Sequence, residues 1–180
     1  CSRLTSVTIP SSVKNIGSEA FYGCSGLNKI SIPEGVTSIE SWAFYGCRGL
    51  TSVSISSSVT SIARDAFRNC NGLVEFFVSA DNPEYSSANG LILSKDGDSL
   101  MLGVNGEVVI PSSVTHIASS AFSGCSKLAS VTIPSSVTNI AVCAFYNSGK
   151  LAKMLIVLEI LTHHLAGESV VVFRIRFVRT

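Results

Sequence analysis

Charged residues are scarce in this sequence. They make up 14% of the 180 residues, and the formal net charge is +1. Proteins that bind nucleic acids present a strongly basic field to the phosphates, and this composition does not supply one. Long apolar stretches are also missing, because the longest run, at residues 154–160, contains Glu159 and is far shorter than the roughly 20 residues of a membrane helix. We therefore expect no nucleic-acid partner and no membrane span.

The sequence also lacks the short motifs that carry common catalytic and cofactor chemistry. It contains no GxSxG elbow, HExxH motif, P-loop or dinucleotide fingerprint, and no two cysteines have the CxxC spacing of a zinc site. His163 and His164 follow Glu159, but a lone histidine pair is weak evidence for a metal site. We expect no enzymatic activity, no cofactor and no bound metal.

Cysteine, by contrast, recurs at a fixed interval. Cys1, Cys24, Cys47 and Cys70 are evenly spaced, and the apolar positions around them follow the same period. The repeating unit, which spans one such period, reads LxxVxIPxxVxxIxxxAFxxCxx. A period of roughly 20 to 50 residues indicates a solenoid, in which one unit cannot bury its apolar face until its neighbours stack on it. We call one such unit a coil.

The repeat is interrupted once. The pattern stops after Phe76 and resumes at Val108, and the step from Cys70 to Cys125 is longer than one period. The match ends after Leu151. We predict one solenoid over residues 1–151, with an insertion at about residues 78–107. Residues 152–180 form either an atypical C-terminal cap, which shields the last coil of a solenoid, or a tail unrelated to the array.

Two parts of this C-terminal region have a periodicity of their own. One set of apolar residues has the spacing of an amphipathic helix, and another set alternates with arginine as in a strand. The first set is Leu151, Met154, Leu155, Leu158 and Leu165, and the second is Phe173, Ile175 and Phe177.

Within one coil, the pattern predicts short strands and a short helical turn, which is a β-rich α/β fold. Val7 and Ile9 alternate with polar residues, so we expect a strand with these two side chains inward. The following proline turns the chain. Ile39, Ala43 and Cys47 then have the i, i+4, i+8 spacing of one helical face. Phe44 should fill the buried corner, with Trp42 pointing outward.

The repeat resembles the BspA-like leucine-rich repeats. Their signature IPxxVxxIxxxAFxxCxxL stands here as IPSSVKNIGSEAFYGCSGL and IPEGVTSIESWAFYGCRGL, and the likeness covers about Cys1 to Leu151. The segment NPEYSSANGLILSKDGDSLML is similar to the hairpin-bearing coil that interrupts such arrays. The resemblance implies a leucine-rich-repeat solenoid from a microbial protein that is secreted or displayed on the cell surface and takes part in adhesion.

Two groups of residues have alternative chemical interpretations. Cys24, Cys47, Cys70 and Cys125 should form a column in the core, where parallel side chains favour buried, unpaired thiols over disulfides, and Cys143 is off register and should be accessible. Residues 95–98, with sequence KDGD, read as a hairpin turn in which Gly97 adopts positive φ. Their two carboxylates could hold calcium, but the spacing of a calcium loop is missing.

The outward strand positions should form one continuous, mostly small and hydroxylated surface. This candidate interaction surface is Ser6, Thr8, Lys29, Ser31, Ser52, Ser54, Glu75, Phe77, Ser130 and Thr132. Such a surface suits extended contact with a protein or glycan ligand on a cell or matrix, and many copies acting together would strengthen the contact. We expect an adhesion module, and the alternative is a structural spacer without a ligand of its own.

Phe77 is the one aromatic residue on this surface. It is either a binding anchor, or it is covered by an inserted coil that folds back and places Leu91, Leu93 or Leu100 over it.

Overall fold

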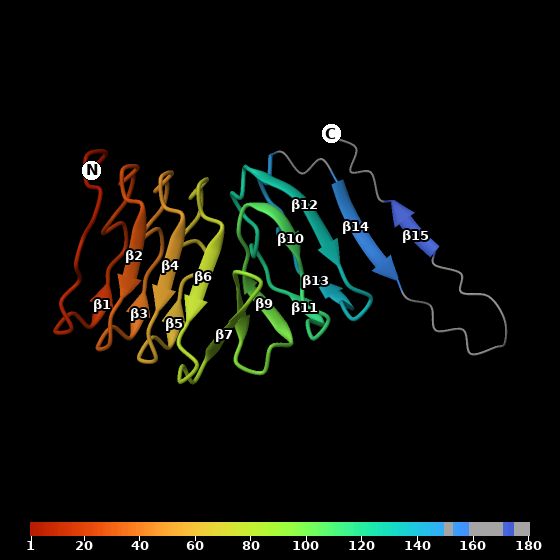
Figure 1. Ribbon diagram of the computed structural model, residues 1–180, viewed down its shortest axis with the longest axis horizontal. Coiled ribbons are helices and arrows are strands. Elements are labelled where there is room, and N and C mark those ends of the chain that lie inside the picture. Colours follow the sequence, from red (N-terminus) through yellow and green to blue (C-terminus); the bar gives the residue numbers. More distant parts are fainter. Residues whose placement is uncertain (150–152, 159–170, 175–180) are drawn as a thin grey trace.

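The computed structural model describes residues 1–149, 153–158 and 171–174. Successive coils stack along one axis, and the strands of neighbouring coils lie side by side from the N-terminal end onward (Figure 1). In the described ranges the chain forms strands, turns and loops but no helix. The predicted β-rich leucine-rich-repeat solenoid is confirmed, and its helical component is not.

The longer strands build one side of the solenoid in two parallel groups. The first group is β2 (Lys29–Ile32), β4 (Ser52–Ile55) and β6 (Glu75–Val78), and the second is β10 (Gly106–Val109), β12 (Leu128–Ile133), β14 (Lys153–Leu158) and the antiparallel β15 (Val171–Arg174). Pairing follows the sequence period, since Ile30 aligns with Val53 and Val53 with Phe76. These three side chains are buried, so the repeat places equivalent apolar residues in one core column.

The strand expected around Val7 and Ile9 is not formed. Ile9 is buried and Thr8 is exposed, as the alternation predicts, but the segment has no regular strand geometry. One long backbone hydrogen bond joins this segment to the next coil, and in it Asn28 N donates to Thr5 O at 3.4 Å. A strand needs a ladder of such bonds, so this expectation was wrong for the first coil.

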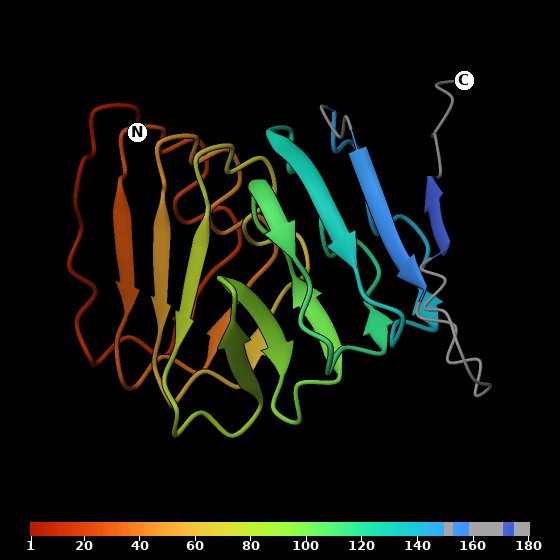
Figure 2. The ribbon, with the colours of Figure 1, turned by 45° about the vertical axis from the view of Figure 1, so that its right-hand side comes forward.

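Short strands build a second side of the solenoid. They are β1 (Asn15–Ile16), β3 (Ser38–Ile39) and β5 (Ser61–Ile62) in one parallel group, and β11 (His116–Ile117) and β13 (Asn139–Ile140) in another. Each follows the turn at the proline position of the repeat, where Val36 N, for example, donates to Pro33 O at 3.4 Å. Figure 2 shows the longer and the shorter strands enclosing the interior between them.

The third side consists of turns, where a helical turn was predicted. Ala43 N donates to Glu40 O and Cys47 N to Phe44 O, at 3.2 and 3.1 Å, so these residues form consecutive tight turns. The intervening Phe44 N donates to Ala66 O of the next coil at 2.8 Å. Trp42 has a φ of 58°, and a residue with positive φ cannot continue a right-handed helix. We call this side the turn corner.

The inserted residues form two hairpins, of which only the one with its turn at residues 95–98 was predicted. β7 (Tyr85–Ala88), β8 (Leu91–Ser94) and β9 (Ser99–Leu102) are successively antiparallel, and β9 then pairs in parallel with β11. Gly97 lies in the turn between β8 and β9 with a φ of 77°, which confirms the expected hairpin turn. The insertion therefore continues the array of short strands.

The core is a continuous stack of repeat positions. Phe44 is fully buried, and its ring lies parallel to those of Phe21 and Phe67, with centroids 5.0 and 5.1 Å away. Trp42 is 42% exposed. The predictions that Phe44 points inward and that Trp42 points outward are both confirmed.

The C-terminal expectations are tested only in part. Residues 153–158 form the strand β14, which pairs in parallel with β12, so the helix predicted through Met154, Leu155 and Leu158 was wrong. β15 includes Phe173 and agrees with the predicted strand. The remaining residues of both sets, Leu151, Leu165, Ile175 and Phe177, lie outside the described residues, as do Glu159, His163 and His164. A cap formed by residues 152–180 stays a prediction.

Candidate functional site

The outward side chains of the longer strands form one face of the solenoid, which we call the strand face. Parallel pairing aligns Ser31 with Ser54 and Ser54 with Phe77, one coil apart. All three are exposed, because their inward neighbours on both sides are held in the core. The face therefore presents a row of equivalent positions along the solenoid axis.

The predicted surface residues are unequally exposed on this face. Ser6, Thr8 and Lys29 are exposed, although the first two lie outside any regular strand. The half-buried members are Ser52, Glu75, Ser130 and Thr132.

Two strand-face residues were missed by the sequence reasoning. Glu107 and Val109 of β10 pair with Ser130 and Thr132 of β12, and both side chains point outward and are exposed. The sequence contained the information needed to find them. Val108, between them, occupies an inward position of the repeat, and each of the two residues precedes its partner by one period.

Phe77 is not covered by the insertion. Its side chain is 50% exposed, whereas Leu91, Leu93 and Leu100 are buried in the core at 0%, 2% and 0%. The covered alternative was therefore wrong. The hairpins fold beneath the strand face because their leucines fill the interior of an additional coil, and they leave the outward positions of β6 open.

Phe77 lies on β6, beside the place where the insertion separates β6 from β10. Val74, next to β6, and Val109, in β10, are 52% and 56% exposed. The β7–β8 turn connects the two strands here. Gly90 O accepts from Phe76 N, and Asn89 Nδ2 donates to Val109 O, both at 2.9 Å. These bonds tie both strands to the same turn.

The four cysteines of the predicted core column, which we call the ladder cysteines, are buried and free, and Cys143 is exposed, as expected. Cys1 is exposed as well. Cys47 Sγ donates to Phe21 O and Cys70 Sγ to Phe44 O, at 3.1 and 3.0 Å. Burial raises the pKa of the Cys125 thiol to about 12. The Cys125 thiol therefore remains protonated, and the four buried cysteines act as small core side chains.

The hairpin turn at residues 95–98 uses its carboxylates internally. Asp96 Oδ1 accepts from Ser94 Oγ at 2.6 Å, and Asp98 Oδ1 accepts from Ser99 Oγ at 2.7 Å. The hydrogen bond from Ser94, followed by the backbone N–H of Asp98, lowers the pKa of the Asp96 carboxyl. Within residues 1–149, 153–158 and 171–174, no three His, Cys, Asp or Glu side chains are grouped as a metal site requires.

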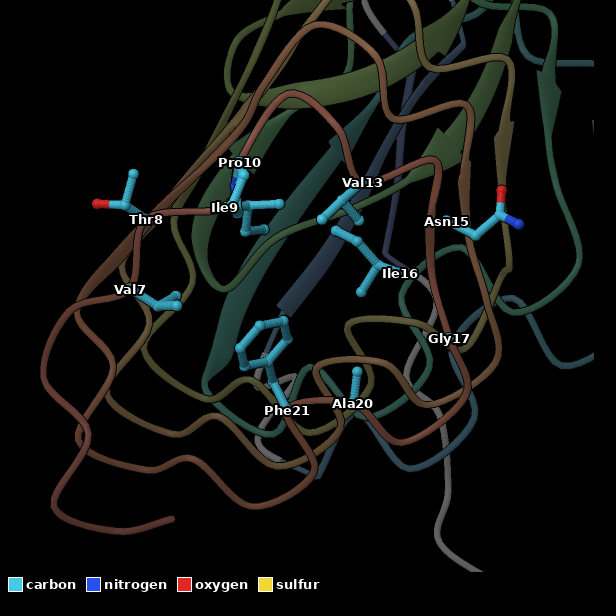
Figure 3. A pocket seen from close by; sticks show the side chains of 10 residues that line it. All are labelled: Val7, Thr8, Ile9, Pro10, Val13, Asn15, Ile16, Gly17, Ala20 and Phe21. Atoms are coloured by element: carbon cyan, nitrogen blue, oxygen red, sulfur yellow. The ribbon is translucent and has the colours of Figure 1, made fainter.

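One apolar pocket opens at the N-terminal end of the solenoid. It has a volume of about 260 Å³, and Figure 3 shows Val7, Ile9, Val13, Ile16 and Phe21 directed toward it. The equivalent positions of the second coil are buried by the third. The pocket is therefore lined mainly by apolar positions of the repeat that are core positions in the other coils, and its polar lining residues are Thr8 and Asn15.

A membrane-crossing helix, which would need both length and continuous apolar character, does not occur in the part of the chain that the structure describes.

Comparisons with known proteins agree with this geometry. None of the curated proteins matches the sequence. A leucine-rich repeat protein from Eubacterium ventriosum has a similar structure, with a TM-score of 0.54 and 17% identity, over 83% of this chain and 59% of that one. The pneumococcal vaccine antigen PcpA gives a TM-score of 0.57 and 22% identity, over 86% and 51%.

These structural similarities show a shared fold, and this chain spans little more than half the length of either protein. The family is shown by the sequence itself. The model of the BspA type leucine-rich repeat region matches six copies over residues 1–88 and 105–163, which is most of the chain and includes every ladder cysteine. This chain belongs to the BspA type leucine-rich repeat family.

Proposed function

We propose that this chain is a non-catalytic adhesion module that binds macromolecules on host or cell surfaces through its strand face, with Phe77 as the anchor. The observation that carries the proposal is the exposure of Phe77, which is 50% accessible within a face of mostly small hydroxylated side chains. An aromatic ring held in water is unfavourable for the free protein, and aromatic residues dominate binding energy when a partner buries them.

The remainder of the strand face supports an extended contact. Ser31 and Ser54 supply hydroxyl groups that both donate and accept hydrogen bonds, and parallel pairing fixes their spacing along the axis. Val74 and Val109 are further exposed apolar side chains near the ends of the β7–β8 turn. An apolar centre with a polar surround is the usual organisation of a protein interface, so a protein or glycoprotein ligand fits this face.

Location at the cell surface or in the extracellular medium is part of the proposal. It is supported by the family resemblance and by the similar fold of a pneumococcal vaccine antigen. Weak individual contacts would then be strengthened by many copies displayed together.

The test compares Phe77→Ser with Ser54→Ala, a matched change in the adjacent strand. The free energy of unfolding of both variants should lie within about 0.5 kcal/mol of the parent value, as is usual for substitutions of exposed residues. Binding to immobilised matrix proteins and to whole cells should fall about tenfold or more for Phe77→Ser, which corresponds to loss of about 1.4 kcal/mol, and should change little for Ser54→Ala.

A parent chain that binds none of these surfaces would favour the spacer alternative. Binding that Phe77→Ser leaves intact would remove Phe77 as the anchor.

A further inference from the structure

A second exposed surface lies on the turn corner, away from the strand face, and does not depend on the proposal above. It is formed by Tyr22, Trp42 and Tyr45, which we call the aromatic cluster. The rings of Tyr22 and Tyr45 are parallel within 6°, with centroids 5.0 Å apart. The ring centroid of Trp42 lies 6.0 Å from that of Tyr45, and the planes of these two rings are inclined by 59°. Tyr22 is 49% exposed, Trp42 is 42% exposed and Tyr45 is half-buried. The cluster is therefore open to solvent.

Trp42 occupies a backbone conformation that bulky residues rarely adopt. Its φ is 58°, and positive φ in a residue of this size is uncommon. Other coils place Glu19, Ser120 and Cys143 at the same repeat position and also with positive φ, so the fold does not require a large side chain there. Strained residues of this kind concentrate at binding sites, and the buried core gains little from Trp42.

Two glutamates belong to the same turns of the chain as the aromatic cluster. Glu19 occupies the repeat position of Trp42 in the preceding coil, and its N–H donates to Ser41 O at 3.3 Å. Glu40 Oε2 accepts from Ser18 N and Ser18 Oγ, at 3.1 and 3.2 Å, which holds this carboxylate over the residue before Glu19. Both glutamates are exposed. Aromatic faces carry a negative quadrupole, so rings and carboxylates together favour a cation.

The same turn corner already contains one such interaction. The guanidinium of Arg68 lies over the ring of Tyr146, 5.2 Å from its centroid. Arg68 and Tyr146 occupy the same repeat position as Tyr22 and Tyr45. Cation–π contact between arginine and tyrosine at this distance is favourable, and the corner geometry therefore accommodates a guanidinium on an exposed ring.

We propose that the aromatic cluster binds an arginine-rich, cationic segment of a protein partner, with Glu19 and Glu40 contributing charge complementarity. A neutral glycan is less favoured. A neutral ligand carries no charge to complement the exposed carboxylates of Glu19 and Glu40. The formal net charge of +1 provides no general attraction for a cationic peptide, so binding must come from the local arrangement.

The experiment uses a hexa-arginine peptide as the probe. Trp42 is the single tryptophan of the chain, so its fluorescence reports directly on this surface and should change saturably on titration. Anisotropy of a labelled peptide should show that Trp42→Ser and Glu19→Gln each weaken binding about two- to fivefold, the range expected for exposed cation–π and charge contacts. Serine occurs at the equivalent position 120, so Trp42→Ser should fold.

The matched control is Glu75→Gln, which removes the same charge from the strand face and should leave affinity unchanged. An equal loss of affinity for the peptide in Glu75→Gln and Glu19→Gln would overturn the proposal, because it would indicate diffuse electrostatic attraction. Absence of saturable binding by the parent chain would also overturn it. A fluorescence change with a neutral hexasaccharide in place of the peptide would reassign the cluster to glycan binding.

Discussion

The ring of Phe44 lies on the ring of Phe67, with centroids 5.1 Å apart and planes inclined by 3°. This contact joins the second coil to the third, and Phe21 makes the equivalent contact from the first coil. Stacked phenylalanines therefore form a column that crosses the boundaries between coils, and the ring of Phe44 contributes to two interfaces.

Phe44→Ala should destabilise the array by about 3 to 5 kcal/mol, because it removes a fully buried ring and leaves a cavity between two coils. Trp42→Ala, two residues away and on the outside, should cost clearly less. Denaturant melts of the two variants provide the comparison, and similar losses would contradict the inward and outward assignment.

Gly103→Ala should also be destabilising, although it adds only one methyl group. A Cβ at this position would overlap the ring of Phe122, which is fully buried. Overpacking of this kind costs about 1 to 3 kcal/mol. Gly17→Ala is the matched control, since its Cβ would meet no atom within 4 Å. In thermal melts, the melting temperature of this control should be close to that of the parent. A neutral Gly103→Ala would mean that Phe122 can move aside.

Only Cys1 and Cys143 should react rapidly with a thiol reagent in the native protein. The four ladder thiols are buried, and a pKa raised to about 12 leaves Cys125 almost fully protonated at neutral pH. Denaturation without reductant should expose all 6 cysteines, and Cys143→Ser should reduce the rapid class to one. Fewer than six thiols after unfolding would reveal disulfides.

The Glu34 carboxylate should titrate below its ordinary pKa of 4.5. Its Oε1 accepts hydrogen bonds from Ser57 N and Ser57 Oγ, at 3.0 and 2.9 Å, and these bonds lower the pKa. Since the folded pKa is the lower one, the stabilisation is present above about pH 4.5 and is lost as the pH falls through the folded value. NMR titration of Ser57→Ala should show the Glu34 pKa rising toward 4.5, whereas Ser54→Ala should not change it.

The repeat could be predicted from sequence because each coil has the same inward positions. Val53 and Phe44 were placed by periodicity alone, and stacking requires those positions to be buried. The turn corner could not be distinguished in this way. Ile39, Ala43 and Cys47 face inward in consecutive turns just as they would on a helix, and the deciding feature is the positive φ of Trp42, which residue type does not indicate.

The environment of Phe77 also could not be predicted from the sequence. Alternation in β6 predicts that Phe77 points outward, but its exposure depends on where the insertion packs. The insertion lacks the repeat pattern, so nothing in its order of residues shows that Leu91 and Leu93 turn into the core. That outcome follows from tertiary packing of β8 between β7 and β9.

The insertion also bears on how such an array can change in length during evolution. β9 supplies a short strand in parallel with β11, and Gly103 N donates to Ala121 O at the turn corner at 2.8 Å. The inserted segment thus occupies a full step of the solenoid, and the coils that follow keep their spacing. Duplication or recombination at this point lengthens the molecule by whole steps, so selection can vary the reach of the protein while every older coil retains its neighbours.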